Sequence, residues 1–402
     1  MTIIIDNLKN QLSCNHPAHF FPEILNLQNK LLQLRRESKI ELQNGDLGLA
    51  SAPSNIALIK YWGKQEGAPQ VPLNSSVSFT LGSFRSLTRI QVCGRFSDDV
   101  VQSRQNHSLA LGRNAEFEYA NSKMQIFLDH LLEGWADDIC LRIESENTFP
   151  TACGIASSAS GYAAMVGAIA DLLQLQKHWS ELDLQAWLNH WSRIGSGSAC
   201  RSVALDGTDN SNVKLNQLKC VAWIKSPDSA HNYSEIILLG PRIASVQHCV
   251  IVVNESEKKV LSSEGHSSVR SSPLQALRLA NIENNFKECI EALKSDDFET
   301  VARLSESDAF AMHSVMQSSV PPLRYIEPLT AVILEKFILV RNKSQAKAFW
   351  TLDAGPNPHF IYLPEAEMFM KEFIKSIEIY TTGEFRVLQN ISHEGLTLGL
   401  QI

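Results

Sequence analysis

The sequence predicts an α+β fold in two domains. Its 402 residues are enough for two or perhaps three hydrophobic cores. In the first half, strand-like segments come before a Ser-rich helix, whereas a parallel α/β repeat would alternate the two. The second half mixes strands and helices, which suits a smaller α+β domain. We place an N-terminal extension at residues 1–46, a first domain at 47–230 and a second domain at 231–402.

The composition narrows the possible partners and the compartment. Net charge is −7, so bulk charge does not indicate a nucleic acid or a membrane surface, and any positive charge that binds an anion must be local. No window approaches the roughly 18 apolar residues of a membrane span, and residues 1–10 do not resemble a signal peptide. The eight cysteines have no C-x-x-C spacing. These features predict a cytoplasmic protein with reduced thiols.

Residues 1–46 are interpreted as an appendage that contains one amphipathic helix. Within 19–39, apolar residues recur between polar ones, and the segment includes the basic pair Arg35 and Arg36. We favour a helix packed on the domain surface over a helix that binds a partner. A turn at 44–46 marks the boundary.

Strands are predicted next along the chain. Residues 47–64 read as a strand, a Pro-led loop and a further short segment. Residues 72–81 read as a polar turn, Asn74-Ser75-Ser76, that leads into an alternating strand. Residues 86–92 and 139–143 alternate similarly.

A Ser-rich helix, predicted over about residues 158–173, is the centre of the first domain. Met165, Ile169 and Leu172 recur at helical spacing. The helix entry offers unpaired backbone N–H groups together with serine hydroxyls, so it can seat an anion. A plain serine N-cap on a core helix explains the same residues about as well. The candidate anion-binding residues are Gly154, Ser157, Ser158 and Ser160.

A second Gly/Ser loop follows the helix predicted at 183–191. It contains Ser196, Ser198 and Arg201. Gly-Ser-Gly-Ser alone is typical of a flexible turn, but the guanidinium of a nearby Arg matches carboxylate and phosphate geometry. Residues 204–217 read as a polar loop.

Two lysines and one aspartate complete the candidate site. Lys60 and Lys64 interrupt an apolar run, and a lysine held there requires an anion. Asp353 ends an apolar strand and precedes Ala-Gly-Pro. An Asp at that place can instead form the turn through its own backbone, and this alternative stays open.

The second half is predicted to contain ten elements. His313, on the second helix, is expected to be a core or surface histidine rather than a catalytic one. The strands are 219–225, 236–239, 249–253, 346–352, 360–363 and 385–388, and the helices are 273–293, 297–314, 330–340 and 365–377.

Five segments together resemble the diphosphomevalonate decarboxylase family of the GHMP kinase superfamily. They occur in the family's order, and the strings I-K-Y-W-G-K, G-S-G-S-A-C-R and D-A-G-P-N are specific in combination. The resemblance implies an N-terminal S5-like α/β domain and a C-terminal ferredoxin-like α+β domain. The segments are 52–64, 73–78, 147–158, 195–201 and 352–357.

The resemblance also implies a reaction. ATP phosphorylates the tertiary 3-hydroxyl of mevalonate 5-diphosphate, and loss of phosphate and CO2 gives isopentenyl diphosphate. Asp353 would orient or deprotonate the hydroxyl. Lys60 would keep that Asp ionised and screen the transferring phosphoryl group, and Arg201 would clamp the substrate carboxylate.

The remaining roles are implied in the same way. Tyr61, Lys64, Ser196 and Ser198 would position the substrate, and the residues from Gly154 to Ser160 would hold ATP with Mg2+. No protein-borne metal cluster, nucleic acid or membrane is expected, and a homodimer is. Three alternatives stay open: a 3-kinase that stops at the phosphorylated product, a decarboxylase of a differently phosphorylated mevalonate, and a non-catalytic relative that only binds nucleotide.

Overall fold

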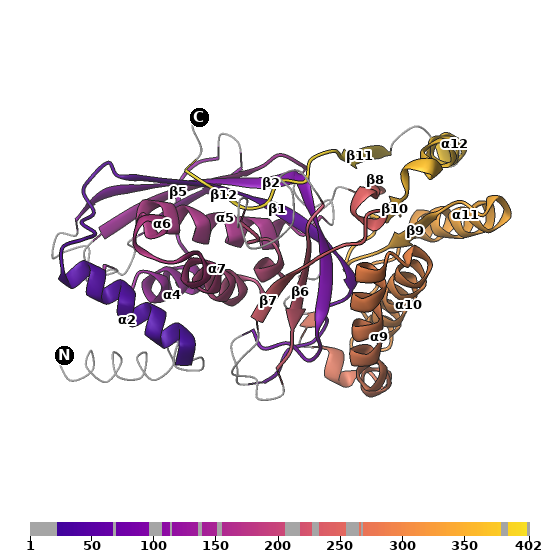
Figure 1. Cartoon of the computed structure of the whole chain (residues 1–402), viewed down its shortest axis with the longest axis horizontal. Helices are drawn as coiled ribbons and strands as arrows, with labels where there is room; N and C mark the ends of the chain where they lie inside the picture. The colour runs from indigo at the N-terminus through magenta and orange to yellow at the C-terminus, as the bar shows by residue number, and fades with distance from the viewer. Residues whose placement is uncertain are drawn as a thin grey trace.

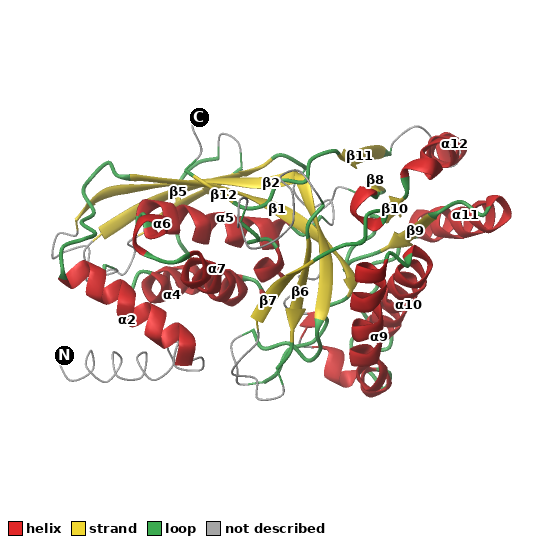
Figure 2. Cartoon of the chain, in the orientation of Figure 1, coloured by secondary structure: helices red, strands yellow, loops and turns green. Residues whose placement is uncertain are grey.

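The computed structural model describes residues 22–66, 70–95, 107–112, 115–135, 139–150, 155–205, 218–226, 233–254, 265–266, 268–378 and 385–399. Two sheets organise these residues, as Figures 1 and 2 show. This arrangement confirms the predicted α+β class. The larger sheet contains β1 (Leu47–Ile59), β2 (Ser76–Arg95), β3 (His107–Leu111), β4 (Glu118–Tyr119), β5 (Ile139–Asn147), β6 (Cys220–Ile224), β7 (Tyr233–Ile237) and β12 (Thr397–Leu398).

Strand β2 pairs with other strands of the larger sheet along both of its edges. One edge pairs antiparallel with β1, while the other edge pairs with β6 at its start and with β5 at its end. The predicted break at Pro53 is wrong, because β1 continues through it. The register shifts between Pro53 and Ser54, and a bulge tolerates a residue that has no N–H for the ladder. The strands predicted at 72–81 and 86–92 likewise merge into β2.

Helices cover one face of this sheet (Figure 1). α5 (Ser157–Leu172) begins one residue before the predicted start and packs against β1 and β2. Beside it lie α7 (Glu181–Gly195), α4 (Ser122–Leu131) and the short α6 (Leu175–His178). α4 and β3 have no counterpart among the elements predicted from the sequence. α2 (Pro22–Arg36) confirms the predicted N-terminal helix, and its Leu27 and Leu31 are buried in the same core as α5.

The smaller sheet is antiparallel, in the order β11 (Arg386–Asn390), β8 (Gln247–Val252), β10 (His359–Tyr362) and β9 (Ala348–Thr351). Val250 belongs to the hydrophobic cluster that includes α9 (Gln275–Ser295) and α10 (Phe298–Gln317). Ile251 belongs to the cluster of α11 (Pro328–Ser344) and α12 (Glu367–Ile377). Both faces are therefore buried, which explains why these strands read as continuous apolar runs.

The two halves of the chain meet at the larger sheet. The predicted boundary near residue 230 lies outside the described residues, and the strands before and after it, β6 and β7, pair with each other. The chain also returns to that sheet near its end, where β12 pairs with β1. Side chains of α9 and α10 share one core with the ends of β1 and β2. The end of β1, at Lys60, lies at this junction.

Among the described residues, no helix is both long enough and apolar enough to cross a membrane. The six cysteines in that part of the chain are free thiols, as the sequence predicts; they are Cys93, Cys140, Cys200, Cys220, Cys249 and Cys289.

Candidate active site

A buried lysine and a partly exposed aspartate form the centre of the site. Lys60 follows β1, and its side chain is 1% exposed; Asp353 follows β9, and its side chain is 24% exposed. Lys60 Nζ donates to Asp353 Oδ1 at 2.7 Å and to the carbonyl of Ala57 at 2.6 Å. Burial lowers the pKa of Lys60, and the charge of Asp353 opposes that change. The buried ammonium group of Lys60 is therefore paired with a carboxylate, that of Asp353, which solvent can still reach.

The turn after Asp353 uses the backbone rather than the carboxylate. Gly355 N donates to the Asp353 carbonyl at 2.7 Å, and His313 Nε2 lies 3.1 Å from the same oxygen. The carboxylate points instead at Lys60. This geometry disfavours the turn-forming interpretation of Asp353. His313 is buried, as expected for a core histidine, and it supports the backbone of the site.

Arg201 is the second buried cation. It ends a short 3-10 helix, Gly197–Arg201, and its Nη1 donates to Ser76 Oγ while Nη2 lies 3.4 Å from Asn55 Oδ1. Within the described part of the chain, its Nε has no hydrogen-bond partner. Burial lowers the pKa of Arg201, whereas Cys200 and Asp353 raise it. A buried guanidinium with a spare donor is suited to an anionic ligand.

Tyr61 lines the same region. Its ring packs on Trp223 and His266, with centroids 4.7 and 4.4 Å away, and its buried hydroxyl has no partner among the described residues. A Cβ added at Gly197 would lie 2.7 Å from that hydroxyl. The Gly-Ser-Gly-Ser loop is thus a close-packed wall against Tyr61, where any side chain at Gly197 would collide, and not a flexible turn.

The two serine segments meet, with Ser158 Oγ 3.4 Å from Ser196 Oγ. The N-cap of α5 is Ala156, which provides no side-chain cap, so the plain serine-cap alternative is wrong. Ser157 is half-buried and Ser158 is exposed at the helix entry. Ser160 is buried, and its hydroxyl bonds to Ser86 at 2.7 Å; it faces the sheet because it lies one turn along the helix.

Three other predicted residues remain. Gly154 lies outside the described residues. Ser198 is half-buried, and its carbonyl accepts from Asn55 at 3.3 Å. Lys64 is half-buried beside Pro72, and burial together with the charge of Lys123 lowers its pKa to about 8. No described carboxylate forms an ion pair with Lys64.

Sequence reasoning missed a buried ion pair next to Lys60. Arg278 of α9 and Asp308 of α10 approach to 2.9 Å, and their side chains are 3% and 1% exposed. The only sequence signal was a charged residue on the buried face of each helix, which does not by itself indicate a partner 30 residues away.

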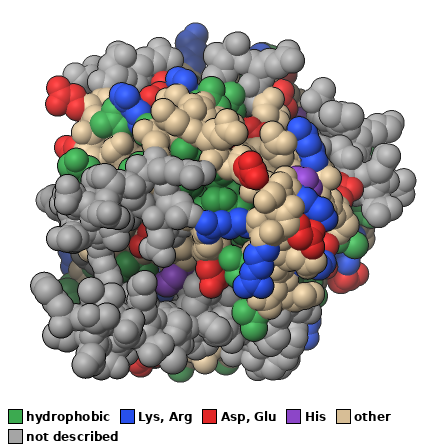
Figure 3. All heavy atoms as spheres, turned by 90° about the vertical axis from the view of Figure 1, so that its left-hand side faces the viewer, with side chains coloured by type: hydrophobic (Ala, Val, Ile, Leu, Met, Phe, Trp, Pro, Cys, Tyr) green, Lys and Arg blue, Asp and Glu red, His purple; other side chains and the backbone are tan. Residues whose placement is uncertain are grey.

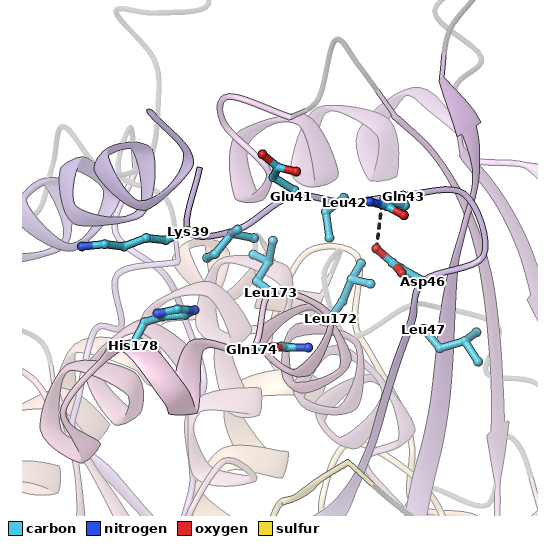
Figure 4. A pocket seen from close by; sticks show the side chains of 11 residues that line it. Lys39, Glu41, Leu42, Gln43, Asp46, Leu47, Leu172, Leu173, Gln174 and His178 are labelled. Atoms are coloured by element: carbon cyan, nitrogen blue, oxygen red, sulfur yellow. Dashed lines mark hydrogen bonds between the residues drawn. The ribbon is translucent and has the colours of Figure 1, made fainter. Parts of the chain in front are cut away.

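Positive charge for an anionic ligand is local. On the face in Figure 3, basic and acidic side chains are interspersed. A separate hollow with a volume of about 320 Å³ lies near Lys39, Leu172 and His178, and none of the predicted site residues lines it. Figure 4 shows the side chains that line this hollow. Within the described ranges, no group of three or more His, Cys, Asp or Glu is arranged to hold a metal ion.

Known proteins match the chain over most of its length. A model of the diphosphomevalonate decarboxylase-like N-terminal domain matches residues 52–217, and a model of the mevalonate 5-diphosphate decarboxylase C-terminal domain matches residues 248–395. The diphosphomevalonate decarboxylase of Schizosaccharomyces pombe is 34% identical over 335 residues, which are 78% of each chain.

Solved structures of such enzymes are similar to this chain over most of its length. One of MDDEF in complex with MVAPP, AMPPCP and magnesium has a TM-score of 0.72 at 27% identity, over 88% of this chain and 99% of that one. One of the mevalonate diphosphate decarboxylase from Enterococcus faecalis has a TM-score of 0.72 at 26% identity, with the same coverage.

Fold and site together define a two-domain enzyme of the GHMP kinase fold, which confirms the expected architecture. Within that class, the coverage and the sequence identity of the matches show which family the chain belongs to. The chain belongs to the diphosphomevalonate decarboxylase family.

Proposed function

We propose that this protein catalyses the ATP-dependent decarboxylation of mevalonate 5-diphosphate to isopentenyl diphosphate, releasing ADP, phosphate and CO2. Relatives that match most of the chain are named for this activity, and the related MDDEF has been solved with MVAPP, AMPPCP and magnesium. The observation that carries the proposal is the 2.7 Å contact between buried Lys60 and Asp353, close to Arg201.

Asp353 accepts the proton of the substrate's tertiary hydroxyl as that oxygen attacks the terminal phosphorus of ATP. A positioned carboxylate can do this only while it is ionised. Lys60 favours the ionised form through its 2.7 Å contact and adds positive charge where the phosphoryl group passes. Because Lys60 is buried, water screens this charge weakly.

Arg201 holds the substrate carboxylate. Its buried guanidinium still has a free Nε donor among the described residues, and a carboxylate accepts from such a group at short range. Phosphate then leaves from the tertiary carbon, and the electron pair of the breaking C–C bond forms the new double bond as CO2 departs. Holding the carboxylate fixes the orientation of that bond.

The surrounding residues position the two substrates. We assign the substrate to Tyr61, which packs against Gly197 of the loop that ends at Arg201, to Ser196 and Ser198 of that loop, and to Lys64. We assign the nucleotide phosphates to Gly154, Ser157 and Ser158, because α5 has an uncapped N-terminus that favours anions. We do not assign Ser160, whose hydroxyl is bonded within the core.

Magnesium fits this site as a companion of the nucleotide. Mg2+ is commonly bound by phosphates, waters and few protein oxygens, and the serine hydroxyls near the α5 entry suit that pattern. When bound with ATP, it supplies charge neutralisation at the phosphates.

Product analysis tests the proposal and separates the rivals. We expect purified protein with ATP and mevalonate 5-diphosphate to release ADP, phosphate and CO2 in equal amounts and to form isopentenyl diphosphate. ADP with a 3-phosphorylated product and no CO2 would identify a 3-kinase. Nucleotide binding without ADP formation would identify a non-catalytic relative.

We also propose that the enzyme acts in the cytoplasm as a homodimer. The free cysteines of the described residues suit a reducing compartment. Light scattering of the purified protein would test the oligomeric state, and microscopy of a tagged chain would test the compartment.

A further inference from the structure

The backbone of Lys60 is held on both sides by side chains from outside its own strand. Its N–H donates to Asp308 Oδ2 at 2.6 Å. Its carbonyl accepts from Arg278 Nη2 at 3.0 Å and from Asn74 Nδ2 at 2.9 Å. These three bonds leave the peptide groups flanking Lys60 little freedom to rotate, so the direction of its side chain is fixed where the strand ends.

The holding groups also fix one another. Arg278 Nη2 lies 2.9 and 3.1 Å from the two carboxylate oxygens of Asp308, and Arg278 Nε lies 3.1 Å from Oδ1. A buried pair of this kind adds little to stability compared with well-packed apolar side chains, because both charges are removed from water. Its position against the backbone of Lys60 indicates another role: the pair fixes the direction of the Lys60 side chain.

Helix α10 contacts both partners of the central pair. Asp308 binds the backbone of Lys60, and His313, five residues further along the same helix, lies 3.1 Å from the backbone carbonyl of Asp353. Neither side chain bonds to the reacting groups themselves. One rigid helix therefore links the two chain segments whose separation sets the 2.7 Å contact between Lys60 and Asp353.

We propose that Arg278 and Asp308 are positioning residues for the reaction: they clamp the backbone of Lys60 so that its ammonium meets Asp353. This inference rests on the proposed function and assigns no role in binding ATP or substrate. A displacement of about 1 Å at a reacting group can cost on the order of 100-fold in rate, so the clamp bears on kcat rather than on KM.

Asp308→Asn is the direct test. The amide keeps the size, but in either orientation it turns an NH2 group toward Lys60 N–H or toward Arg278, so one side of the clamp is lost. The matched control is Glu306→Gln on the same helix. Glu306 pairs with Arg341 and accepts from Trp350 N at 3.2 Å, but it makes no hydrogen bond to Lys60 or Asp353.

For Asp308→Asn we expect kcat for isopentenyl diphosphate to fall about 10- to 100-fold, with KM for both substrates within about threefold of wild type. For Glu306→Gln we expect kcat within about twofold of wild type, even if melting temperature falls equally. If Asp308→Asn does not fold, Arg278→Lys decides, because it keeps the charge of the pair and loses the fork that reaches the Lys60 carbonyl.

The pH profile separates positioning from general destabilisation. Lys60 faces the charges of Asp353, Asp308 and Arg201, and it is also near His313 and His359. Asp308 raises the pKa of Lys60, so its loss should move the basic limb of kcat to lower pH in Asp308→Asn and not in Glu306→Gln.

Equal kcat values and overlapping pH profiles for the two variants would overturn the inference, as would wild-type kcat in folded Arg278→Lys. A wild-type enzyme that forms no isopentenyl diphosphate would instead overturn the proposed function.

Discussion

At the scale of single residues, the site is built around two buried cations. Arg201 and Lys60 are both buried cations, and the structure places Lys60 against Asp353 as their separate motifs implied. Lys60 was readable from sequence because it interrupts an apolar run, and Arg201 because it follows a Gly/Ser loop. Arg278 and Asp308 were not, because each looks like one polar residue on an amphipathic helix and only tertiary packing joins them.

Asp353→Asn tests the residue to which we assign the most direct chemical role. Asn keeps the size and leaves the backbone turn at Gly355, but it cannot accept the proton. We expect product formation to fall about 100- to 10,000-fold, while affinity for a non-hydrolysable ATP analogue and melting temperature change little. Steady-state rates, analogue titration and thermal melts on one preparation measure all three.

A turn-forming aspartate far from the site provides the control. Asp46 Oδ2 accepts from Gln43 N at 2.7 Å, so Asp46→Asn should show the opposite pattern, with normal turnover and a small loss of stability. If Asp353→Asn keeps more than about a tenth of the wild-type rate, Asp353 is not the acid/base of this reaction.

At the scale of elements, periodicity located most helices and strands, but not their extents. β1 and β2 were predicted in pieces because Pro53 and the polar residues near 82–85 resemble strand ends. The register pairs Pro53 with Arg85 and Ser54 with Leu81, so both strands continue while residues 82–84 of β2 form an irregularity opposite the proline. Such continuity depends on a neighbouring strand, which local sequence does not reveal.

The N-terminal helix is more integrated than an appendage. Ile24, Leu27 and Leu31 of α2, together with Ile40 and Leu42, are buried in the core that α5 and α7 share, and Lys30 pairs with Asp183 at 2.9 Å. The sequence alone suggested an appendage packed on the domain surface. The burial of these five side chains indicates instead that removing this segment would expose apolar surface of the first domain.

Leu31→Ala measures what α2 contributes. Leu31 is 0% exposed, and deleting a buried leucine side chain typically lowers the free energy of unfolding by about 2–5 kcal/mol. Leu25→Ala on the same helix is the control, because Leu25 is 37% exposed and should lose only a small part of that. Urea denaturation of both variants gives the comparison; equal, small losses would mean that α2 contributes little to the stability of the fold.

At the scale of the whole molecule, the two halves share a core and a site. α9 and α10 belong to the second half, yet they pack against the ends of β1 and β2 and hold the backbone of Lys60. Asp353 comes from the second half and Arg201 from the first. The family resemblance could predict that Lys60 and Asp353 meet, whereas composition and periodicity could not, because that contact joins residues 293 positions apart.

Buried histidines make the stability of the whole fold depend on pH. His107 and His313 are buried, and burial lowers the pKa of each to about 4, from an ordinary 6.5. His248 and His359 contact each other at 2.8 Å, and burial lowers both of their pKa values as well. In the unfolded chain these side chains take up protons near pH 6.5, whereas in the folded chain they stay neutral until much lower pH.

Stability from these residues is therefore fully present above about pH 6.5 and is lost as pH falls toward 4, since protons then favour the unfolded chain. His107→Asn tests this at a site away from the chemistry; Asn can still accept from Leu141 N, as His107 Nδ1 does at 3.2 Å. Its free energy of unfolding should decline less steeply than that of wild type between pH 6.5 and 4, by up to about 3 kcal/mol over the window. Exposed His178 is the matched position, and His178→Asn should follow the wild-type curve in urea titrations at each pH. Parallel curves for wild type and His107→Asn would mean that other groups cause the acid sensitivity of this fold.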